Sequence, residues 1–204
     1  MQERLRARVV RAGRPERILR VAGLDAHYDP KLRRSVGAAV LLSWPECVLE
    51  ESALACRSTD FPYVPGLLSF REAPVLLAAL ALLRTRPDLL FVDGQGYAHP
   101  RRFGLACHVG LLAGIPAIGV AKSRLVGEFR EPGAAAGAQS PLYDREEVVG
   151  AVVRTREGTR PLFVSVGHGI ALEAAVALVF AACRGYRLPE PTRLADHLSR
   201  AARR

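Results

Sequence analysis

The order of the apolar segments limits the possible folds of this chain more than any other feature of its sequence. Three segments with strand character come first, at 17–29, 35–44 and 46–56, and short connections join them as in an antiparallel meander. Expected helices at 69–84 and 102–114 then alternate with the short apolar strands "PDLLFVDG" and "IPAIGVAK". This order predicts an α/β fold with a mixed central sheet, antiparallel in its first three strands and parallel after them, and with helices on both faces.

The second half of the chain is less regular. The stretch 131–142, "EPGAAAGAQSPL", has no periodicity and is expected to be a loop, and nothing in the sequence assigns a role to its Ala/Gly run at 133–138. The segments "EVVGAVVRT" and "PLFVSVG" flank a turn at Glu157 and Gly158 and predict a second hairpin. The segment "IALEAAVALVFAAC" predicts a strongly apolar helix.

Length and composition restrict the class of protein. A chain of 204 residues is expected to form one domain, with a basic segment at about 1–18 and a basic tail at about 197–204 that frays. No apolar stretch is long enough to cross a bilayer, and the N-terminus lacks the apolar core of a secretory signal, so a cytoplasmic monomer without a membrane partner is expected. The cysteines have no CxxC spacing and are expected to be small buried apolar side chains; they are Cys47, Cys56, Cys107 and Cys183.

The charge balance favours a polyanionic partner. The net charge is +9, from 29 Lys and Arg against 20 Asp and Glu, and nucleic acid is the first partner to consider. The alternative explanation is a GC-rich genome that uses arginine freely. Charge alone does not decide between the two.

Two aspartates stand at the apolar strands. Asp25 falls inside the first strand segment, and Asp93 ends the segment "LLFVDG". Burying an unpaired carboxylate costs several kcal/mol, so such residues are usually paired or bound to a metal. Asp93 can alternatively be a turn residue before Gly94, whereas Asp25 has no turn beside it. The two aspartates are therefore candidate metal ligands.

Glu72 has two competing interpretations. The segment from Ser69 to Glu72 matches the S-x-x-E capping box, in which the glutamate closes the start of a helix, and the local sequence favours this reading. Taken together with Asp25 and Asp93, however, Glu72 is a third acid on a separate element. An oxygen-only ligand set of this kind suits Mg²⁺, with Mn²⁺ as a substitute.

Several basic positions fit the hydrolysis of a phosphodiester by such a metal site. Lys122 ends a strand and is expected to orient water or to offset phosphate charge, although it can also be an ordinary surface lysine. His168 precedes the apolar helix, whose N-terminus disfavours an imidazolium, so it is expected to be neutral and to act as a ligand or proton acceptor. The alternative for His168 is a loop histidine bound to backbone. A phosphate-contacting patch is expected at His99, Arg101 and Arg102.

Six segments of the chain, in order, resemble the endonuclease V family. They are "VAGLD", "PYVPGLLSFRE", "LLFVDGQGYAHPRRFGLACHVGLL", "PAIGVAKSRLVGEF", "SVGHGIALEAAV" and "GYRLPEPTR", and the match runs from about residue 19 to about 196. The resemblance implies a ribonuclease H-like fold with a five-stranded mixed sheet. It also implies a Mg²⁺-dependent repair enzyme that acts on DNA containing deaminated adenine (deoxyinosine). Such an enzyme cuts the second phosphodiester bond on the 3′ side of the lesion and leaves 3′-hydroxyl and 5′-phosphate ends.

The resemblance also implies roles for individual residues. Asp25 and Asp93 become metal ligands, and Glu72 becomes a third acid of the metal site. His168 becomes a catalytic or metal-proximal residue, and Lys122 a contact to phosphate or water. The family's base pocket falls on Gly66, Leu68, Gly94, Gly104 and Leu125.

The segment "PYVP" resembles the wedge of the family. In this reading Tyr63 enters the duplex beside the damaged base, while Pro62, Val64 and Pro65 form the stiff loop around it. An aromatic ring that stacks on a base contributes about 1–3 kcal/mol, and a damaged pair costs less to open than an intact one. The alternative is that Tyr63 is buried in the protein's own core.

Two other functions remain open on the sequence. One is a non-catalytic module that binds nucleic acid on the same scaffold, although the presence of Asp25, Glu72 and Asp93 speaks against it. The other is a related nuclease that acts mainly on inosine-containing RNA.

Overall fold

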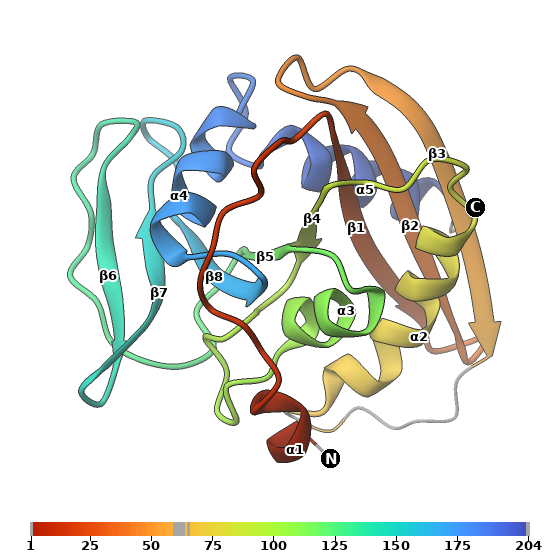
Figure 1. The fold of residues 1–204 in the computed structure, drawn as a ribbon, viewed down its shortest axis with the longest axis horizontal. Coiled ribbons are helices and arrows are strands. Elements are labelled where there is room, and N and C mark those ends of the chain that lie inside the picture. Colours follow the sequence, from red (N-terminus) through yellow and green to blue (C-terminus); the bar gives the residue numbers. More distant parts are fainter. Residues whose placement is uncertain (1, 59–63, 65, 203–204) are drawn as a thin grey trace.

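The structure, a computed structural model, describes residues 2–58, 64 and 66–202. One central sheet contains all of its strands (Figure 1), which in chain order are β1 Arg20–Asp29, β2 Arg34–Ser43, β3 Leu49–Ser58, β4 Leu89–Asp93, β5 Ala117–Ala121, β6 Gln139–Asp144, β7 Glu147–Val153 and β8 Leu162–His168. The helices are α1 Gln2–Arg6, α2 Leu68–Ala81, α3 Leu105–Ala113, α4 Leu172–Ala181 and α5 Glu190–Ala201.

The predicted fold class is confirmed. The sheet order is β3-β2-β1-β4-β5-β8-β7-β6; β1, β2 and β3 pair antiparallel, and β4 and β5 then join β1 in parallel. The expected number of five strands is wrong, because β8, β7 and β6 extend the same sheet beyond β5 by antiparallel pairing. Every residue of β5 is buried, as expected of a strand with neighbours on both sides.

The predicted loop at 131–142 is also wrong in part. Its last residues begin β6, an edge strand that pairs with β7. Within β6 only Leu142 is buried, so the strand lacks the alternation by which a half-buried strand is recognised. Pro141 stands in this strand, as an edge position permits.

Apolar side chains fill both sides of the sheet. One cluster joins α2 and α3 to Ala22 and Leu24 of β1. A second cluster joins α4 and α5 to Val21 of the same strand, on the opposite face. The two faces of β1 are therefore both covered, and the face that carries Val21 and Gly23 also carries Asp25.

Gly23 is the point at which α5 approaches the sheet most closely. A Cβ added to Gly23 would lie 1.9 Å from the backbone oxygen of Pro191, which no side chain can accept. The absence of a side chain at this position lets the helix lie directly on β1. It thereby brings the polar residues of α5 within reach of Asp25.

We expect Gly23→Ala to destabilise the fold by about 3 kcal/mol, the upper end of the cost of overpacking, because the contact is with rigid backbone. Urea unfolding followed by circular dichroism measures the change. Gly133→Ala is the matched control, since its added Cβ would make an ordinary contact at 3.6 Å with the Cβ of Ala138. Equal stability of the two variants would contradict the proposed close packing.

The prediction that the tail at 197–204 frays is wrong over most of its length. Helix α5 runs to Ala201, and Ser199 is fully buried. Its buried positions include Thr192, Ala195, Asp196 and Ser199, which follow the spacing of one helical face. This face packs on β1, so α5 is part of the core as far as Ser199.

The four cysteines are free thiols, as expected. Cys47 and Cys107 are buried and Cys183 is half-buried, whereas Cys56 is exposed on β3, so the prediction of four buried side chains is wrong for Cys56.

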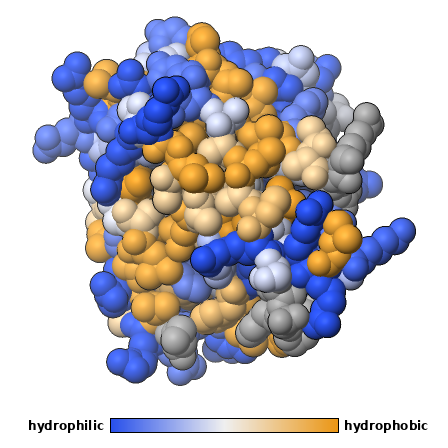
Figure 2. All heavy atoms as spheres, turned by 90° about the vertical axis from the view of Figure 1, so that its right-hand side faces the viewer, coloured by the Kyte–Doolittle hydropathy of each residue, from blue (hydrophilic) through white to orange (hydrophobic). Residues whose placement is uncertain are grey.

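Strand β3 is an edge of the sheet, and Figure 2, which views the molecule from this side, shows a broad apolar area. Among the described residues, no helix is long and apolar enough to cross a membrane.

Candidate active site

Two aspartates lie side by side on the central strands β1 and β4, at the point where β4 ends. Strands β1 and β4 are parallel and pair Leu24 with Val92, so the next residues, Asp25 and Asp93, are neighbours. Asp196 of α5 faces them, and one carboxylate oxygen from each of Asp25, Asp93 and Asp196 lies within 4.8 Å of the others. Three elements that are far apart in sequence thus build one carboxylate cluster.

Helix α5 supplies a second polar group to the cluster. The hydroxyl of Ser199 donates a hydrogen bond to Oδ2 of Asp25. Ser199 is fully buried, so its hydroxyl holds this carboxylate in a fixed orientation. Such a supporting hydrogen bond is typical of residues that orient metal ligands.

Lys122 lies between two of the carboxylates. Its Nζ donates to Oδ2 of Asp93 at 2.5 Å and to Oδ1 of Asp196 at 2.6 Å. Burial acts to lower the pKa of Lys122, but the two aspartates outweigh it and raise the pKa above its ordinary value. The lysine therefore remains charged and offsets part of the negative charge of the cluster.

Burial disfavours the charged form of each acid of the site, and for Asp25 and Asp93 it is the dominant effect on the pKa. Burial, and then the charge of Asp93, raise the pKa of Asp25 to about 7. Burial also raises the pKa of Asp93. For Asp196 burial acts upward, but the hydrogen bond and charge of Lys122 dominate together with Arg200, and its pKa is lowered. Closely spaced, buried carboxylates of this kind are stabilised as anions by a bound cation.

Glu72 is a buried acid near this cluster but is not part of its closest set. Burial raises the pKa of Glu72 to about 8; the charge of Arg71 acts downward, and the charges of Asp25 and Asp93 act upward. The capping-box interpretation is wrong, because the N-cap of α2 is Leu67 and no side chain caps it. Glu72 therefore occupies the inner face of its helix, where a metal-site acid is expected.

The structure places His168 away from the carboxylates, so the prediction of a metal-proximal histidine is wrong. Strand β8 runs antiparallel to β5, and His168 pairs with Ala117 at the start of β5, whereas Asp93 pairs with Val120 near its end. His168 therefore lies toward the opposite ends of these strands from Asp93. There its Nδ1 accepts a hydrogen bond from the backbone N–H of Val10 at 3.3 Å. Burial and the charge of Arg8 lower its pKa, so the expected preference for the neutral form does hold.

Sequence reasoning missed three residues of the site, namely Asp196, Ser199 and Arg187. The segment "GYRLPEPTR" ends in the first turn of α5, and this helix repeats polar or small buried residues at the spacing of one face. That spacing was the available signal for Asp196 and Ser199. Arg187 donates from Nη2 to the backbone oxygen of Lys122 at 3.0 Å, and so holds the strand end that carries the lysine.

Removing the Ser199 hydroxyl is expected to weaken metal binding without unfolding the protein. Because Ser199→Ala deletes a hydrogen bond that orients Asp25, we expect the dissociation constant of the carboxylate cluster for Mg²⁺ to rise about tenfold. Isothermal titration with Mg²⁺ measures this constant. Ser52→Ala, at an exposed position on β3, is the control. An unchanged dissociation constant would show that Ser199 does not support the site.

The predicted phosphate patch is only partly compatible with the structure. His99 is buried, and its Nδ1 accepts a hydrogen bond from the backbone N–H of Arg101. Arg102 forms ion pairs with Asp144 at 2.6 Å and with Glu147 at 2.9 Å. His99 and Arg102 are thus engaged within the protein, and Arg101, although exposed, donates from Nη1 to Gln2 and to Gly66. The phosphate contacts of the three residues stay a prediction.

The segment assigned to the wedge lies largely outside the described residues. Pro62, Tyr63 and Pro65 are not among them, and their role stays a prediction. Val64 is described and is exposed. Gly66, the first residue after the wedge segment 62–65, has a φ of 78°, a left-handed value that favours glycine.

Gly66, Gly94 and Gly104, all assigned to the base pocket, each pack closely against another part of the chain. A Cβ on Gly104 would come within 2.3 Å of the backbone oxygen of Gln95, so glycine is required there. A Cβ on Gly94 would meet the side chain of Leu105 at 3.2 Å. A Cβ added to Gly66 would lie 3.0 Å from Nη1 of Arg101, which precedes Gly104 in the 99–104 loop. Leu68, half-buried, begins α2 nearby in sequence.

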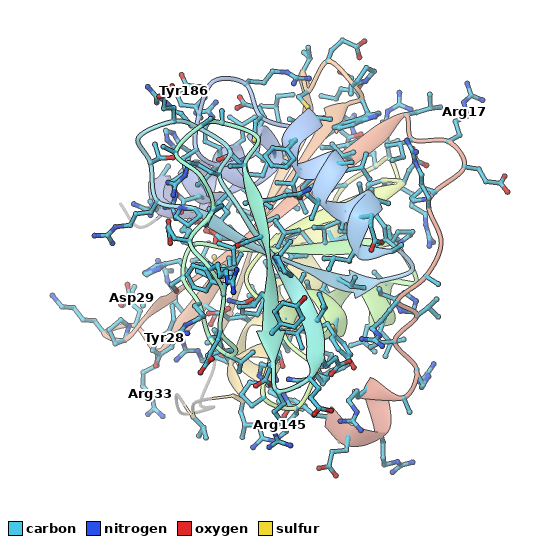
Figure 3. All side chains as sticks on the ribbon, turned by 90° about the vertical axis from the view of Figure 1, so that its left-hand side faces the viewer. Arg17, Tyr28, Asp29, Arg33, Arg145 and Tyr186 are labelled. Atoms are coloured by element: carbon cyan, nitrogen blue, oxygen red, sulfur yellow. The ribbon has the colours of Figure 1, made fainter. Side chains whose placement is uncertain are left out.

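Basic and polar side chains surround a surface groove. Leu125 is half-exposed and lines a groove of about 630 Å³ together with Arg124, Tyr143 and Arg145. Figure 3 shows Arg145 at the turn between β6 and β7 and Arg33 at the end of the β1–β2 hairpin, both at the surface. Exposed arginines on separate turns suit contact with the phosphates of a polyanion.

Comparisons of the sequence with known proteins agree on one family. A sequence model of the family described as Endonuclease V matches residues 3–197. An Endonuclease V of Roseiflexus sp. (strain RS-1) is 50% identical over 199 residues, which cover 98% of this chain and 89% of that relative. An Endonuclease V of Gloeobacter violaceus is 47% identical over 207 residues, which cover 100% of this chain and 84% of the relative.

Solved structures give the same answer. The endonuclease V of Streptomyces avermitilis superposes with a TM-score of 0.93 at 46% identity, covering 98% of this chain and 89% of that one. The endonuclease V of Ciona intestinalis, solved in complex with a DNA that contains an inosine followed by a ribo-adenosine, has a TM-score of 0.87 at 30% identity, with 98% and 94% coverage. The family match over nearly the whole chain and the shared architecture lead to one conclusion: this chain belongs to the endonuclease V family.

Proposed function

We propose that this nuclease is a metal-dependent DNA repair endonuclease that recognises deoxyinosine. It hydrolyses the second phosphodiester bond on the 3′ side of the lesion and leaves 3′-hydroxyl and 5′-phosphate ends. The observation that carries the proposal is the cluster of Asp25, Asp93 and Asp196 on three separate elements. The proposal also includes action as a monomer in the cytoplasm.

The donor set of the cluster fits Mg²⁺, with Mn²⁺ as a substitute. All three side chains offer carboxylate oxygen, the ligand that hard divalent cations prefer, and Glu72 adds a fourth buried acid nearby. When bound, the metal supplies Lewis-acid activation of the phosphodiester and a water of lowered pKa. Asp25, Asp93 and Asp196 would hold it.

The other residues of the site bind and orient. Lys122, which contacts Asp93 and Asp196, is placed to offset charge on the scissile phosphate or to position water. Ser199 holds Asp25, and Arg187 holds the backbone of Lys122. A preorganised arrangement of charges of this kind lowers the barrier because it needs no rearrangement during the reaction.

Selection of the damaged base is assigned to a different part of the chain. Tyr63, between Pro62 and Pro65, is proposed to stack in the gap that the extruded base leaves, and the backbone around Gly66, Gly94 and Gly104 is proposed to contact that base. Opening a mispaired hypoxanthine costs less than opening an intact pair, which favours the lesion before any contact is made.

The decisive test uses duplexes that differ in one base. A labelled duplex with a single deoxyinosine should be nicked in Mg²⁺, and the same duplex with deoxyadenosine, or the reaction in EDTA, should not. Ligation of the product and its length on a denaturing gel report the end groups and the cut position. Absence of nicking on every substrate would overturn the enzymatic proposal and favour a binding module.

A second candidate function is cleavage of inosine-containing RNA. The observation in its favour is the Ciona intestinalis relative, whose bound DNA carries a ribo-adenosine after the inosine. A third oligonucleotide, RNA with a single inosine, separates the two functions. Cutting of the RNA alone would overturn the repair assignment.

A further inference from the structure

The buried amide of Gln2 ties the short helix α1 to distant parts of the chain. The side chain of Gln2 is 4% exposed, although the next residues of the helix, Glu3 and Arg4, are exposed. A helix of five residues is not stable on its own in water. Its position therefore depends on the contacts that Gln2 makes with distant parts of the chain.

Gln2 uses both ends of its amide in these contacts. Nε2 donates to the backbone oxygen of Gly66 at 3.0 Å and to that of Phe103 at 3.2 Å. Oε1 accepts from Nη1 of Arg101 at 3.0 Å, and the same nitrogen donates to the oxygen of Gly66 at 3.1 Å. Gln2, Arg101 and Gly66 thus form a closed set of hydrogen bonds.

The two segments that Gln2 joins are those assigned to base recognition. Gly66 directly follows the wedge segment 62–65 in sequence, and Phe103 directly precedes Gly104. Gly66 has a left-handed φ of 78°, and it belongs to no helix or strand. The hydrogen bonds from Gln2 and Arg101 to its oxygen therefore hold this turn against the loop at 99–104.

We propose that Gln2 is a positioning residue for recognition of the damaged base. By holding Gly66 against the 99–104 loop, it fixes the spacing between Gly66 and Gly104, two glycines assigned to the base pocket. This inference rests on the proposed function and assigns to the N-terminal helix a part in selectivity that the carboxylate cluster does not need. Gln2 has no contact with Asp25, Asp93 or Asp196 among the interactions of the described residues.

The test compares two variants of Gln2 with a control on the same helix. Gln2→Met keeps the length of the side chain and removes all of its hydrogen bonds. Gln2→Glu keeps the acceptor for Arg101 but cannot donate to the two backbone oxygens. Glu3→Gln, at the exposed neighbouring position, is the control. The melting temperature of each variant shows whether the fold is intact.

Single-turnover nicking in Mg²⁺ gives two readouts for each protein. The first is the enzyme concentration for half-maximal rate on the deoxyinosine duplex, together with the maximal rate. The second is the inhibition constant of an unlabelled undamaged duplex. For both Gln2 variants we expect the half-maximal concentration to rise about tenfold, with the maximal rate and the inhibition constant unchanged within about twofold, because hydrogen bonds that organise the lesion site are lost.

The outcomes separate this inference from the proposed function. A wild-type protein that does not prefer deoxyinosine overturns the proposed function and the inference with it. A selective wild type whose Gln2 variants are equally selective overturns the inference alone. A parallel loss of affinity for damaged and undamaged duplex, or a loss confined to the maximal rate, also overturns it, since either result marks a general structural role.

Discussion

Asp93→Asn is expected to lower the nicking rate on the order of a thousandfold or more while leaving the protein folded. Asp93 ends β4 beside Asp25 and accepts the hydrogen bond of Lys122, so its charge would serve both the proposed metal and the lysine. An asparagine of the same size keeps the packing and removes the charge. Rates on the deoxyinosine duplex at saturating Mg²⁺ measure the loss. Anisotropy of a labelled duplex measures binding, which we expect to change less than about threefold, because phosphate and base contacts lie elsewhere.

The control for Asp93→Asn is the same substitution at the other end of β4. Oδ2 of Asp88 accepts hydrogen bonds from the backbone N–H groups of Leu19 and Arg20, a role that an asparagine oxygen can also fill. Asp88→Asn should therefore nick at nearly the wild-type rate. Loss of binding to the damaged duplex in a folded Asp93→Asn protein would contradict the division between cutting and recognition.

The second large effect is expected at Asp196. Asp196→Asn removes the one carboxylate that α5 contributes to the cluster, and we expect a loss of rate on the order of a thousandfold. Isothermal titration with Mg²⁺ provides a readout that does not depend on activity. It should show weaker binding, because one of three charged ligands is missing.

Two further variants locate this effect. His197→Ala changes the next residue, which is exposed on the other side of α5, and should leave the rate and Mg²⁺ binding unchanged. His168→Ala tests the alternative from the sequence, and its rate should remain within about threefold of wild type, since the residue lies beside the start of β5, away from Asp93. A large loss of rate with normal stability in His168→Ala would overturn the site described above.

Much of the fold followed from local pattern. Alternation in the first strand placed Val21, Gly23 and Asp25 on one face, and the structure confirms that arrangement. The short apolar segment ending in Asp93 could be recognised as a buried strand because all of its preceding residues are apolar. That Asp25 and Asp93 lie next to each other is decided by the parallel pairing of β1 with β4, which places Leu24 opposite Val92.

Other elements could not be recognised in this way. Strand β6 buries only Leu142, so its sequence has no period, and its pairing with β7 defines it. Ser69 and Glu72 match a capping box in sequence, yet the N-cap of α2 is Leu67, two residues before Ser69, and Glu72 is turned inward. For β6 the decisive interaction is the pairing with β7, which the pattern of the β6 segment itself does not show.

The sequence by itself determined the mixed sheet and pointed to the aspartates of its first and fourth strands as candidate metal ligands. Only the tertiary structure decided which other residues join them. Because β8 runs antiparallel to β5, the end of β8 places His168 beside the start of β5, away from Asp93. The sequence of a short apolar strand does not indicate whether it pairs in parallel or antiparallel with its neighbour. Because Gly23 has no side chain, α5 lies directly on β1 and brings Asp196 and Ser199 to Asp25. Strand direction and helix approach are set by contacts between distant residues, and so they appear only in the folded chain.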